Sequence, residues 1–544
     1  MKWKALILLT IVLTFPAMIP SAQQEEGSGH YTYIYTVKES GWIDIVTRFN
    51  STGEGSTWVL VPKFRDYNFT VLSGSIKDKK LIRDTSYYFY SNLTFSYTPG
   101  TNVEISWSYR FGALIVEPNG AFFSTQIAFS RQDDATILVK LPTDFVPQGI
   151  EPKGYELRRE GEYNVVKYDV DGSKNNTMRV LISFKVKDGQ EFKKREVGKL
   201  TISYPPRYED VVDNITRYYE ATLPLIEEYT SVREEIPVKV KLFVPGTMEE
   251  ITTLGYTGPR FTSDVITQGE INLNMMLVRM PDYELPNTFV HELLHQYMQA
   301  AGLSVDLRWA HEGLAQYLSS VIVEKALGFH VPYDKEAERA VMIQTGGDLS
   351  FILGWKGGGL PGNPGLYYTA SEVLIRRLAE KYGGPDLYKR FFQLIRRDRV
   401  IVKEPGEFVR YLSEAAGQDI SDFLKSFGID VESIDETTLT LMKTAREYAE
   451  ATSWFNPFSK EALEILSESR TKEAAIHAMA MVALGLVSEA LIAAVVIYGI
   501  ASLLKGRKAP SEHGSTVSEK EWYGEGLRTP SPTSQGEAES STSP

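Results

Sequence analysis

A run of 27 residues near the C-terminus constrains the fold of this chain more than any other segment. It covers residues 478–504, contains one ionisable side chain, Glu489, and is followed by Lys505, Arg507 and Lys508. The length suits the hydrocarbon core of a bilayer, and positive charge flanks membrane helices on the cytoplasmic side. The run therefore predicts a single transmembrane helix over 478–504 with its C-terminal end in the cytoplasm. Glu489 either meets a partner within the membrane, or the true span starts later in the chain and tilts less; we favour the simpler interpretation that the apolar residues around it tolerate it.

The N-terminus has the features of a secretory signal. A positively charged start and an apolar stretch over 5–13 precede the small residues Ser21 and Ala22. This pattern predicts a signal peptide over 1–22, and the alternative is an uncleaved N-terminal anchor. Residues 505–544 are rich in Ser, Thr, Pro, Gly and Glu, which predicts a disordered cytoplasmic tail. We therefore predict a single-pass protein of the cell membrane whose N-terminal bulk is extracellular.

Five Asn-x-Ser/Thr sequons lie between the predicted signal and the predicted membrane helix. Their asparagines are Asn50, Asn68, Asn92, Asn175 and Asn214. Such asparagines accept N-linked glycans in extracellular segments. We predict these five positions as possible glycosylation sites.

The composition excludes several classes of protein and of site. The 544 residues exceed the size of one compact core, so two or more folded units are expected. The formal net charge of −12 argues against a nucleic-acid-binding surface. The absence of cysteine excludes disulfides, thiolate metal ligands and thiol nucleophiles. A bound metal ion must therefore use His, Asp or Glu ligands.

Two folded regions are predicted between the signal and the membrane helix. Residues 23–200 contain short runs of β-forming residues separated by turn signals such as Pro99-Gly100, which predicts an all-β, sandwich-like domain. Residues 201–430 begin with a helix and two strands and continue with helices. This order predicts an α+β domain with a mostly helical C-terminal half. A helical stalk over 431–477 then leads to the membrane.

The strongest chemical signal is the sequence His291-Glu292-Leu293-Leu294-His295. Positions four apart lie on one face of a helix, so His291 and His295 can bind the same metal ion. Glu292 lies about 100° from His291 around the helix and is poorly placed as a direct ligand. It can instead take a proton from the attacking water. The segment therefore predicts a catalytic metal site.

A third metal ligand is expected shortly after this segment. Glu312 follows His295 by 17 positions, which gives room for one helix to end and a second to pack back across it. Two histidines and one glutamate form the ligand set of one class of catalytic zinc site. The neighbouring His311 is a competing candidate, because imidazole is also a good zinc ligand.

The His-Glu-x-x-His segment at 291–295 and the Trp-x-x-Glu-Gly-x-Ala-x-Tyr segment at 309–317 resemble the gluzincin zinc metallopeptidases. The likeness is to their aminopeptidase-N-like and peptidase MA branches, and it covers roughly residues 205–430. It implies a thermolysin-like zincin fold with one Zn²⁺ per chain. It also selects Glu312 over His311 as the third zinc ligand.

The same resemblance implies a tyrosine whose hydroxyl stabilises the oxyanion of the reaction. The segment Gly-Leu-Tyr-Tyr-Thr-Ala-Ser-Glu over 365–372 is similar to that element and places Tyr368 in this role. Ser371 replaces the glycine that is usual in aminopeptidases. Tyr367 is the next candidate, and the alternative for Tyr368 is an aromatic side chain packed at the start of a helix.

One departure from the aminopeptidases concerns the strand that holds the free amine of the substrate. Their Gly-x-Met-Glu-Asn strand corresponds here to Gly-Glu-Ile-Asn-Leu-Asn over 269–274, in which Glu270 is a candidate for binding an amine. Exopeptidase and endopeptidase activity are therefore both open. The strand itself can still pair with an extended substrate through backbone hydrogen bonds.

These features together predict a membrane-anchored extracellular zinc peptidase. His291, His295 and Glu312 hold the metal, Glu292 acts as general base, and Tyr368 stabilises the oxyanion. The expected partners are a peptide or protein substrate and the membrane, with no nucleic acid. A surface binding or adhesion protein with a degenerate zinc site is one alternative, against which the intact Glu292 argues. A zinc hydrolase of a non-peptide bond is the other, and the sequence leaves substrate identity and oligomeric state open.

Overall fold

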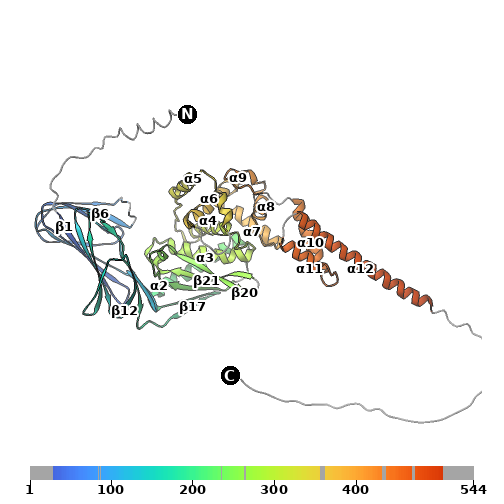
Figure 1. The fold of residues 1–544 in the computed structure, drawn as a ribbon, viewed down its shortest axis with the longest axis horizontal. Coiled ribbons are helices and arrows are strands. Elements are labelled where there is room, and N and C mark those ends of the chain that lie inside the picture. Colours follow the sequence, from blue (N-terminus) through green and yellow to red (C-terminus); the bar gives the residue numbers. More distant parts are fainter. Residues whose placement is uncertain are drawn as a thin grey trace, which may run out of the picture. The chain divides into compact units, whose positions relative to one another are not determined.

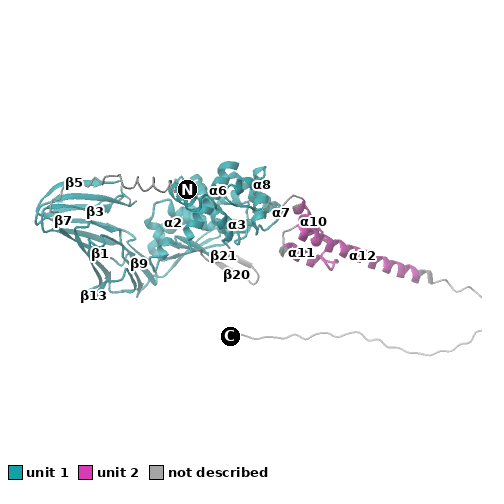
Figure 2. Ribbon diagram, turned by 45° about the horizontal axis from the view of Figure 1, so that its top comes forward, with its two compact units in different colours: residues 1–434 teal, residues 435–544 magenta. Residues whose placement is uncertain are grey.

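The computed structural model describes residues 28–506 except for 84, 86, 88, 234–235, 263–264, 356–361, 432–435 and 469–471. The chain forms two compact units, residues 1–434 and residues 435–544 (Figure 2). The predicted signal peptide lies outside the described residues, as does the predicted tail from residue 507 onward. Figure 1 labels the helices and strands used below.

An N-terminal β-rich region forms the first part of the larger unit, which confirms that part of the predicted fold. Its largest sheet has seven strands, in the order β13 (Glu156–Glu160), β14 (Tyr163–Asp171), β11 (Asp134–Pro142), β1 (Gly29–Val37), β2 (Ile43–Ser51), β7 (Asn102–Tyr109) and β4 (Asn68–Ser73). The side chains of β1 alternate between buried and half-buried positions. This period of two is the pattern of a strand with one face on a core.

Three smaller sheets complete the β-rich region among the described residues. One has the order β12 (Phe145–Glu151), β16 (Leu181–Val186), β9 (Asn119–Phe123) and β8 (Ala113–Val116). The others are β3 (Gly55–Pro62), β6 (Tyr90–Tyr97) and β5 (Ile76–Ile82), and the pair β10 (Ile127–Ala128) and β15 (Thr177–Met178). One hydrophobic core includes Tyr31 of the large sheet, Phe95 of β6 and Phe122 of β9. The three larger sheets therefore share a core.

A five-stranded sheet begins the second region of this unit. Its order is β17 (Lys193–Val197), β18 (Leu200–Tyr204), β19 (Val238–Phe243), β21 (Val265–Asn274) and β20 (Gly255–Thr262), so β20 lies at an edge. The division expected at residue 200 falls within the β17–β18 hairpin. The polar, largely exposed β17 (sequence Lys-Lys-Arg-Glu-Val) lacks the apolar alternation that would have assigned it to this sheet.

Helices dominate the rest of the larger unit, as predicted. They are α2 (Glu209–Thr230), α3 (Glu284–Ala301), α4 (Arg308–Leu327), α5 (Lys335–Thr345), α6 (Pro364–Tyr382), α7 (Asp386–Asp398), α8 (Pro405–Ala416) and α9 (Ser421–Lys425), with short 3-10 turns between some of them. α3 contacts β20 and β21 as well as α4. It is therefore held between the sheet and the later helices (Figure 1).

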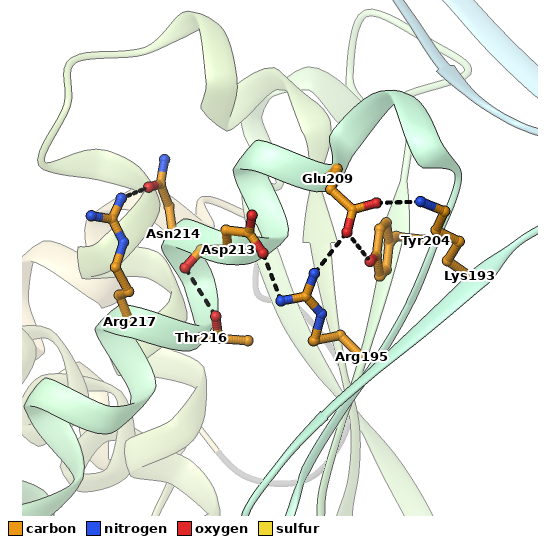
Figure 3. A network of polar contacts seen from close by, with 8 residues as sticks. All are labelled: Lys193, Arg195, Tyr204, Glu209, Asp213, Asn214, Thr216 and Arg217. Atoms are coloured by element: carbon orange, nitrogen blue, oxygen red, sulfur yellow. Dashed lines mark hydrogen bonds and ion pairs between the residues drawn. The ribbon is translucent and has the colours of Figure 1, made fainter.

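A polar network fastens the β17–β18 hairpin to the start of α2 (Figure 3). Glu209 is the first residue of α2, and its carboxylate pairs with Lys193 and Arg195 of β17, each at 2.7 Å. Arg195 also pairs with Asp213 one turn later, at 2.7 Å, and the Tyr204 hydroxyl donates to Glu209 at 3.0 Å. A carboxylate at a helix N-terminus also interacts favourably with the helix dipole.

Charged contacts also join the β-rich region to the second region within this unit. The guanidinium of Arg207 pairs with Glu117, and both side chains are largely buried. Arg110 pairs with Asp210 at 2.5 Å. Arg279 donates to the backbone oxygen of Phe123 at 2.8 Å. Removing one partner of a buried ion pair strongly destabilises a protein, because the other charge is left buried without compensation. Arg207 and Glu117 therefore hold these two regions together only as a pair.

The predicted glycosylation positions differ in their exposure. The exposed ones are Asn50, Asn68 and Asn175. Asn92 is half-buried and its Oδ1 atom is buried. The half-buried Asn214 accepts a hydrogen bond from Arg217 (Figure 3). Glycan attachment needs a free amide nitrogen in solvent, so the three exposed positions suit it best.

The second unit contains α10 (Glu436–Thr452), α11 (Ser459–Glu468) and α12 (Lys472–Gly506). Within α12 the segment Lys472–Ser502 is long and apolar enough to cross a membrane. The helix thus begins before the predicted span at 478, inside the predicted stalk. The start of α12 is rich in Ala and Met, which suit both packing against other helices and a membrane. Composition therefore could not separate the stalk from the span.

Candidate metal centre

Helix α3 carries His291, Glu292 and His295 in the middle of its length. The Nε2 atoms of His291 and His295 lie 3.1 Å apart, as expected for positions separated by about one turn. The helix ends at Gly302, which has a φ of 108°, and a Cβ there would lie 2.4 Å from the backbone oxygen of Val400. Glycine is required at this turn, which directs the chain back toward α4.

Helix α4 brings Glu312 to the two histidines. Its Oε2 atom lies 3.3 Å from the Nε2 atoms of both His291 and His295. The next residue, Gly313, faces α6, where an added Cβ would lie 2.7 Å from the backbone oxygen of Ser371. Close packing of α4 on α6 therefore holds Glu312 over α3. The glycine of the Glu-Gly pair has a steric role.

The three ligand atoms have the spacing of a zinc site. They form a triangle with sides of 3.1, 3.3 and 3.3 Å, and the side chains are 13%, 8% and 11% exposed. Zinc binds nitrogen and oxygen at about 2.0–2.2 Å in tetrahedral geometry, which separates neighbouring ligand atoms by about 3.3 Å. Among the described residues, His291, His295 and Glu312 are the group of His, Asp and Glu side chains able to share one ion. The donor set fits zinc.

The charges within this cluster favour a bound cation. Burial opposes ionisation of Glu312, but the charge of His295 and hydrogen bonds with His291 and His295 lower the pKa of its carboxyl below the usual range. Burial also opposes protonation of His295, yet the charge of Glu312 raises its pKa. Glu312 is therefore a carboxylate at neutral pH, where it can pair with a metal cation.

His311 lies behind the cluster, on the far side of His295. Its Nδ1 atom is 3.1 Å from Nδ1 of His295, and its Nε2 atom is 3.0 Å from the backbone oxygen of Leu303. A carbonyl oxygen only accepts, so Nε2 of His311 carries a proton, and its Nδ1 accepts one from His295. Burial and the charge of His295 lower the pKa of His311 to about 3, which keeps it neutral. His311 thus contacts the proposed ligand His295 on the side opposite the ligand triangle.

Glu292 points toward the edge strand β20. The hydroxyl of Thr257 donates to its Oε2 atom at 2.7 Å, and a Cβ at Gly255 would lie 3.1 Å from its Oε1 atom. Thr257 orients the carboxylate, and the glycine leaves space beside the other oxygen. Sequence reasoning missed both residues, because no spacing in the sequence connects them with α3.

The two candidate tyrosines at the start of α6 have different surroundings. Tyr367 packs against Phe351 and Trp355, with ring centroids 4.9 and 5.6 Å away. The ring of Tyr368 also packs against Trp355, with centroids 5.0 Å apart. In addition Tyr368 is hydrogen-bonded to Arg308, and burial together with the charge of Glu312 raises its pKa to about 12. The Tyr368 hydroxyl therefore remains protonated at neutral pH and is close enough to the cluster to sense its charge.

Arg308 is a third residue that the sequence did not reveal. Its Nε atom lies 3.7 Å from Oε1 of Glu312, one turn later on α4, and its guanidinium lies 5.1 Å from the ring of Trp355. It also hydrogen-bonds Tyr368. Arg308 therefore connects the third proposed ligand with the proposed oxyanion donor. A helical i,i+4 spacing to Glu312 was the available signal.

Glu270 lies on β21 and forms an ion pair of 2.5 Å with Lys241 on β19. Among the described residues no hydrogen bond or ion pair joins it to the His–Glu cluster, and its role as an amine-binding residue stays a prediction. The expected pairing of a substrate with residues 269–274 needs correction. Residues 271–273 of β21 pair with β19 on one side and β20 on the other. Within the β20–β21 hairpin, β20 is the strand at the edge of the sheet.

The comparisons with known proteins assign no family to this chain, so its proposed function rests on the geometry of the site. No family model and no curated protein match the chain. Among the solved structures that it resembles is an aminopeptidase N family protein from Idiomarina loihiensis. The two are 11% identical, the match covers 73% of this chain and 75% of the other, and the TM-score is 0.28.

Proposed function

We propose that the protein is a zinc-dependent peptidase anchored in the membrane, with its larger unit outside the cell. The observation that carries the proposal is the triangle of His291, His295 and Glu312, with sides of 3.1–3.3 Å, next to the carboxylate of Glu292. A structural histidine cluster would need no acidic residue placed beside it and oriented from another element. Here Thr257 supplies that orientation.

Each residue of the site has a separate role in the proposed mechanism. A zinc ion held by the three ligands would polarise the scissile carbonyl and acidify the attacking water. Glu292 takes the proton of that water and passes it to the leaving nitrogen. The hydroxyl of Tyr368 donates a hydrogen bond to the developing oxyanion, and Arg308 holds that tyrosine. Arg308 is a positioning residue, because it contacts Glu312 and Tyr368 and acts through them.

The edge strand supports a peptide as substrate. Thr257 and Gly255 belong to β20 and contact Glu292, so the edge of the sheet passes the proposed general base. An extended peptide can add to such an edge through main-chain hydrogen bonds. A sugar or a simple ester lacks the regularly spaced N–H and C=O groups that pair with the edge of a strand. This geometry favours the peptidase over the other zinc hydrolases.

Metal analysis and peptide hydrolysis by the purified full chain in detergent test the proposal. We expect one equivalent of zinc, activity that a chelator abolishes, and recovery when zinc is restored. Glu292→Gln should keep the metal and lose about 10²–10⁴-fold or more in turnover, because an amide cannot accept the proton. His330→Gln, an exposed histidine on the loop after α4, is the matched control.

Two results would contradict the proposal. Hydrolysis by Glu292→Gln at the wild-type rate would remove the general base from the mechanism. A folded wild-type protein that binds zinc and peptide but cleaves no peptide, ester or glycoside would instead support the surface binding protein.

A further inference from the structure

Helix α12 has two parts with different surroundings. Its first part packs against α10 and α11, where Ala475, Ala478 and Val482 are buried with residues of those helices. Beyond Gly485 the apolar side chains are half-buried or exposed, and every residue over 490–502 is exposed. In both views α12 continues well past α10 and α11 (Figure 1, Figure 2). The helix therefore changes from a packed to an unpacked surface near residue 485.

The loop between α10 and α11, residues 453–458, lies at this point of change. We call it the aromatic loop, because its sequence is Ser-Trp-Phe-Asn-Pro-Phe. The buried Asn456 donates from Nδ2 to the backbone oxygen of Val482 at 3.1 Å. A Cβ at Gly485 would lie 1.7 Å from Oδ1 of Asn456, so glycine is required for this approach. The hydrogen bond to Val482 and the close approach to Gly485 together fix the position of the loop along the length of α12.

Trp454 is the most exposed large apolar side chain of this loop. It is 83% exposed and stacks edgewise on Phe455, with ring centroids 4.5 Å apart. Tryptophan is enriched at the level of lipid headgroups, where its ring is partly in apolar and partly in polar surroundings. A loop that exposes Trp454, packed on the half-buried Phe455, beside a bare apolar helix suits a lipid surface.

The helices beside the first part of α12 exclude it from the hydrocarbon. Exposed charged residues cover their outer faces: Lys443, Glu447, Glu450, Lys460 and Glu461. Burying such charged groups in the hydrocarbon of a bilayer is energetically costly. The packed part of α12 must therefore lie in water along with α10 and α11.

We propose that the outer surface of the bilayer lies at the aromatic loop, with Trp454 in the headgroup layer and the hydrocarbon beginning near Leu486. The inference rests on the proposed membrane anchoring by α12. The 19 residues from Leu486 to Leu504 span about 28 Å as a helix, close to the ~30 Å of hydrocarbon. Glu489 then lies within the first turn below the surface, where its carboxylate can reach water. On this proposal the hydrocarbon span would begin about two turns after the predicted start at residue 478.

Single cysteines test the depth, because the natural chain contains none. The full chain is reconstituted in vesicles of phosphatidylcholine and phosphatidylglycerol and treated with a membrane-impermeant maleimide. Leu484→Cys should react about tenfold or more faster than Ala494→Cys, because water is excluded from the hydrocarbon. Both positions are exposed on α12, so protein packing does not explain a difference, and both should react fully in detergent after denaturation. Equal protection of the two cysteines would overturn the proposed entry point.

A second measurement tests the loop independently. An environment-sensitive dye on Ser453→Cys should be quenched by nitroxide lipids labelled near the headgroup more than by lipids labelled deep in the chains. The same dye on Lys443→Cys, an exposed position on α10, should remain unquenched and emit as in water. Replacing Trp454 and Phe455 by serine should reduce the quenching at Ser453. A dye at Ser453 that no nitroxide lipid quenches would refute the contact between loop and membrane.

The two proposals fail in different ways. Release of the wild-type chain from vesicles by alkaline carbonate would overturn the anchoring itself. A chain that resists carbonate but has a protected Leu484→Cys, or an unquenched dye at Ser453→Cys, would leave the membrane anchor intact. It would overturn only the proposed depth of α12 in the bilayer.

Discussion

At the scale of residues, the two nitrogen atoms of His295 have separate partners. Nε2 faces His291 and Glu312, whereas Nδ1 faces His311, which is itself held by the backbone oxygen of Leu303. This polarity fixes a proton on Nδ1 and leaves the lone pair of Nε2 for a metal. Partners of this kind orient ligating histidines and raise their basicity.

His311→Leu should therefore weaken zinc binding by about 10–100-fold without removing it. His311→Asn places an amide oxygen near the position of Nδ1 and should recover part of that loss. Competition with a chelating dye at fixed pH measures the affinity, and His330→Leu is the control. Complete loss of zinc in a folded His311→Leu protein would instead make His311 a direct ligand.

Tyr368 allows a prediction that combines substitution and pH. Its hydroxyl, with a pKa of about 12, stays protonated far above neutral pH. Tyr368→Phe should lower turnover about 10²–10³-fold, more than it weakens substrate binding, since the hydrogen bond matters chiefly in the transition state. The ratio of wild-type to variant turnover should stay constant between about pH 6 and pH 9. Tyr367→Phe keeps its packed ring and should act as the wild type; a ratio that collapses below pH 9 would exclude Tyr368 as a neutral donor.

At the scale of elements, the site depends on how closely α4 and α6 approach. Gly313 allows this approach, because a Cβ there would meet the backbone oxygen of Ser371 and the side chain of Ile375, each at 2.7 Å. A backbone oxygen cannot move aside as the end of a flexible side chain can. The third proposed ligand is thus positioned by the residue that follows it.

Gly313→Ala should lower the free energy of unfolding by about 1–3 kcal/mol, the usual cost of overpacking. It should also weaken zinc binding, because displacement of α4 moves Glu312. Urea unfolding and the chelator competition measure the two effects. Gly354→Ala, where a Cβ meets nothing within 4 Å, is the matched control. Unchanged stability of Gly313→Ala would mean that the two helices separate at little cost.

At the scale of the whole molecule, the boundary between the units decides where the chain can be shortened. The larger unit ends at residue 434, and α10 and α11 form their core with Ala475, Ala478 and Val482 of α12. A protein ending after residue 431 should be soluble without detergent and keep its activity, since every proposed catalytic residue precedes that position. One ending at Ser469 should aggregate, because the core of α10 and α11 loses its cover. Size-exclusion chromatography compares them, and a monomeric, stable Ser469 form would show that α10 and α11 pack without α12.

Local patterns predicted the β-rich region, the helical half and the His–Glu segment, because each depends on spacing within one element. His291 and His295 are neighbours on any helix. Glu312 joins them when the chain turns back after that helix and a second helix packs against it. Thr257, whose contact with Glu292 arises from packing of an edge strand on α3, had no such signal. Glu489 suggested that the span could start later than residue 478, but composition did not locate the division of α12 near Gly485, since alanine suits both a helix interface and a lipid environment.

If the protein is the proposed peptidase, the position of β20 at the edge of its sheet, beside Glu292, would give it a form of quality control. A segment can lie along this strand only after it has given up its own helix or sheet, so a folded neighbour presents nothing to cut. The rate at which a protein is degraded would then follow how often it locally unfolds, and not how many susceptible bonds its sequence contains. An enzyme of this design would spare intact surface proteins and remove loosened ones, with no need to recognise either by sequence.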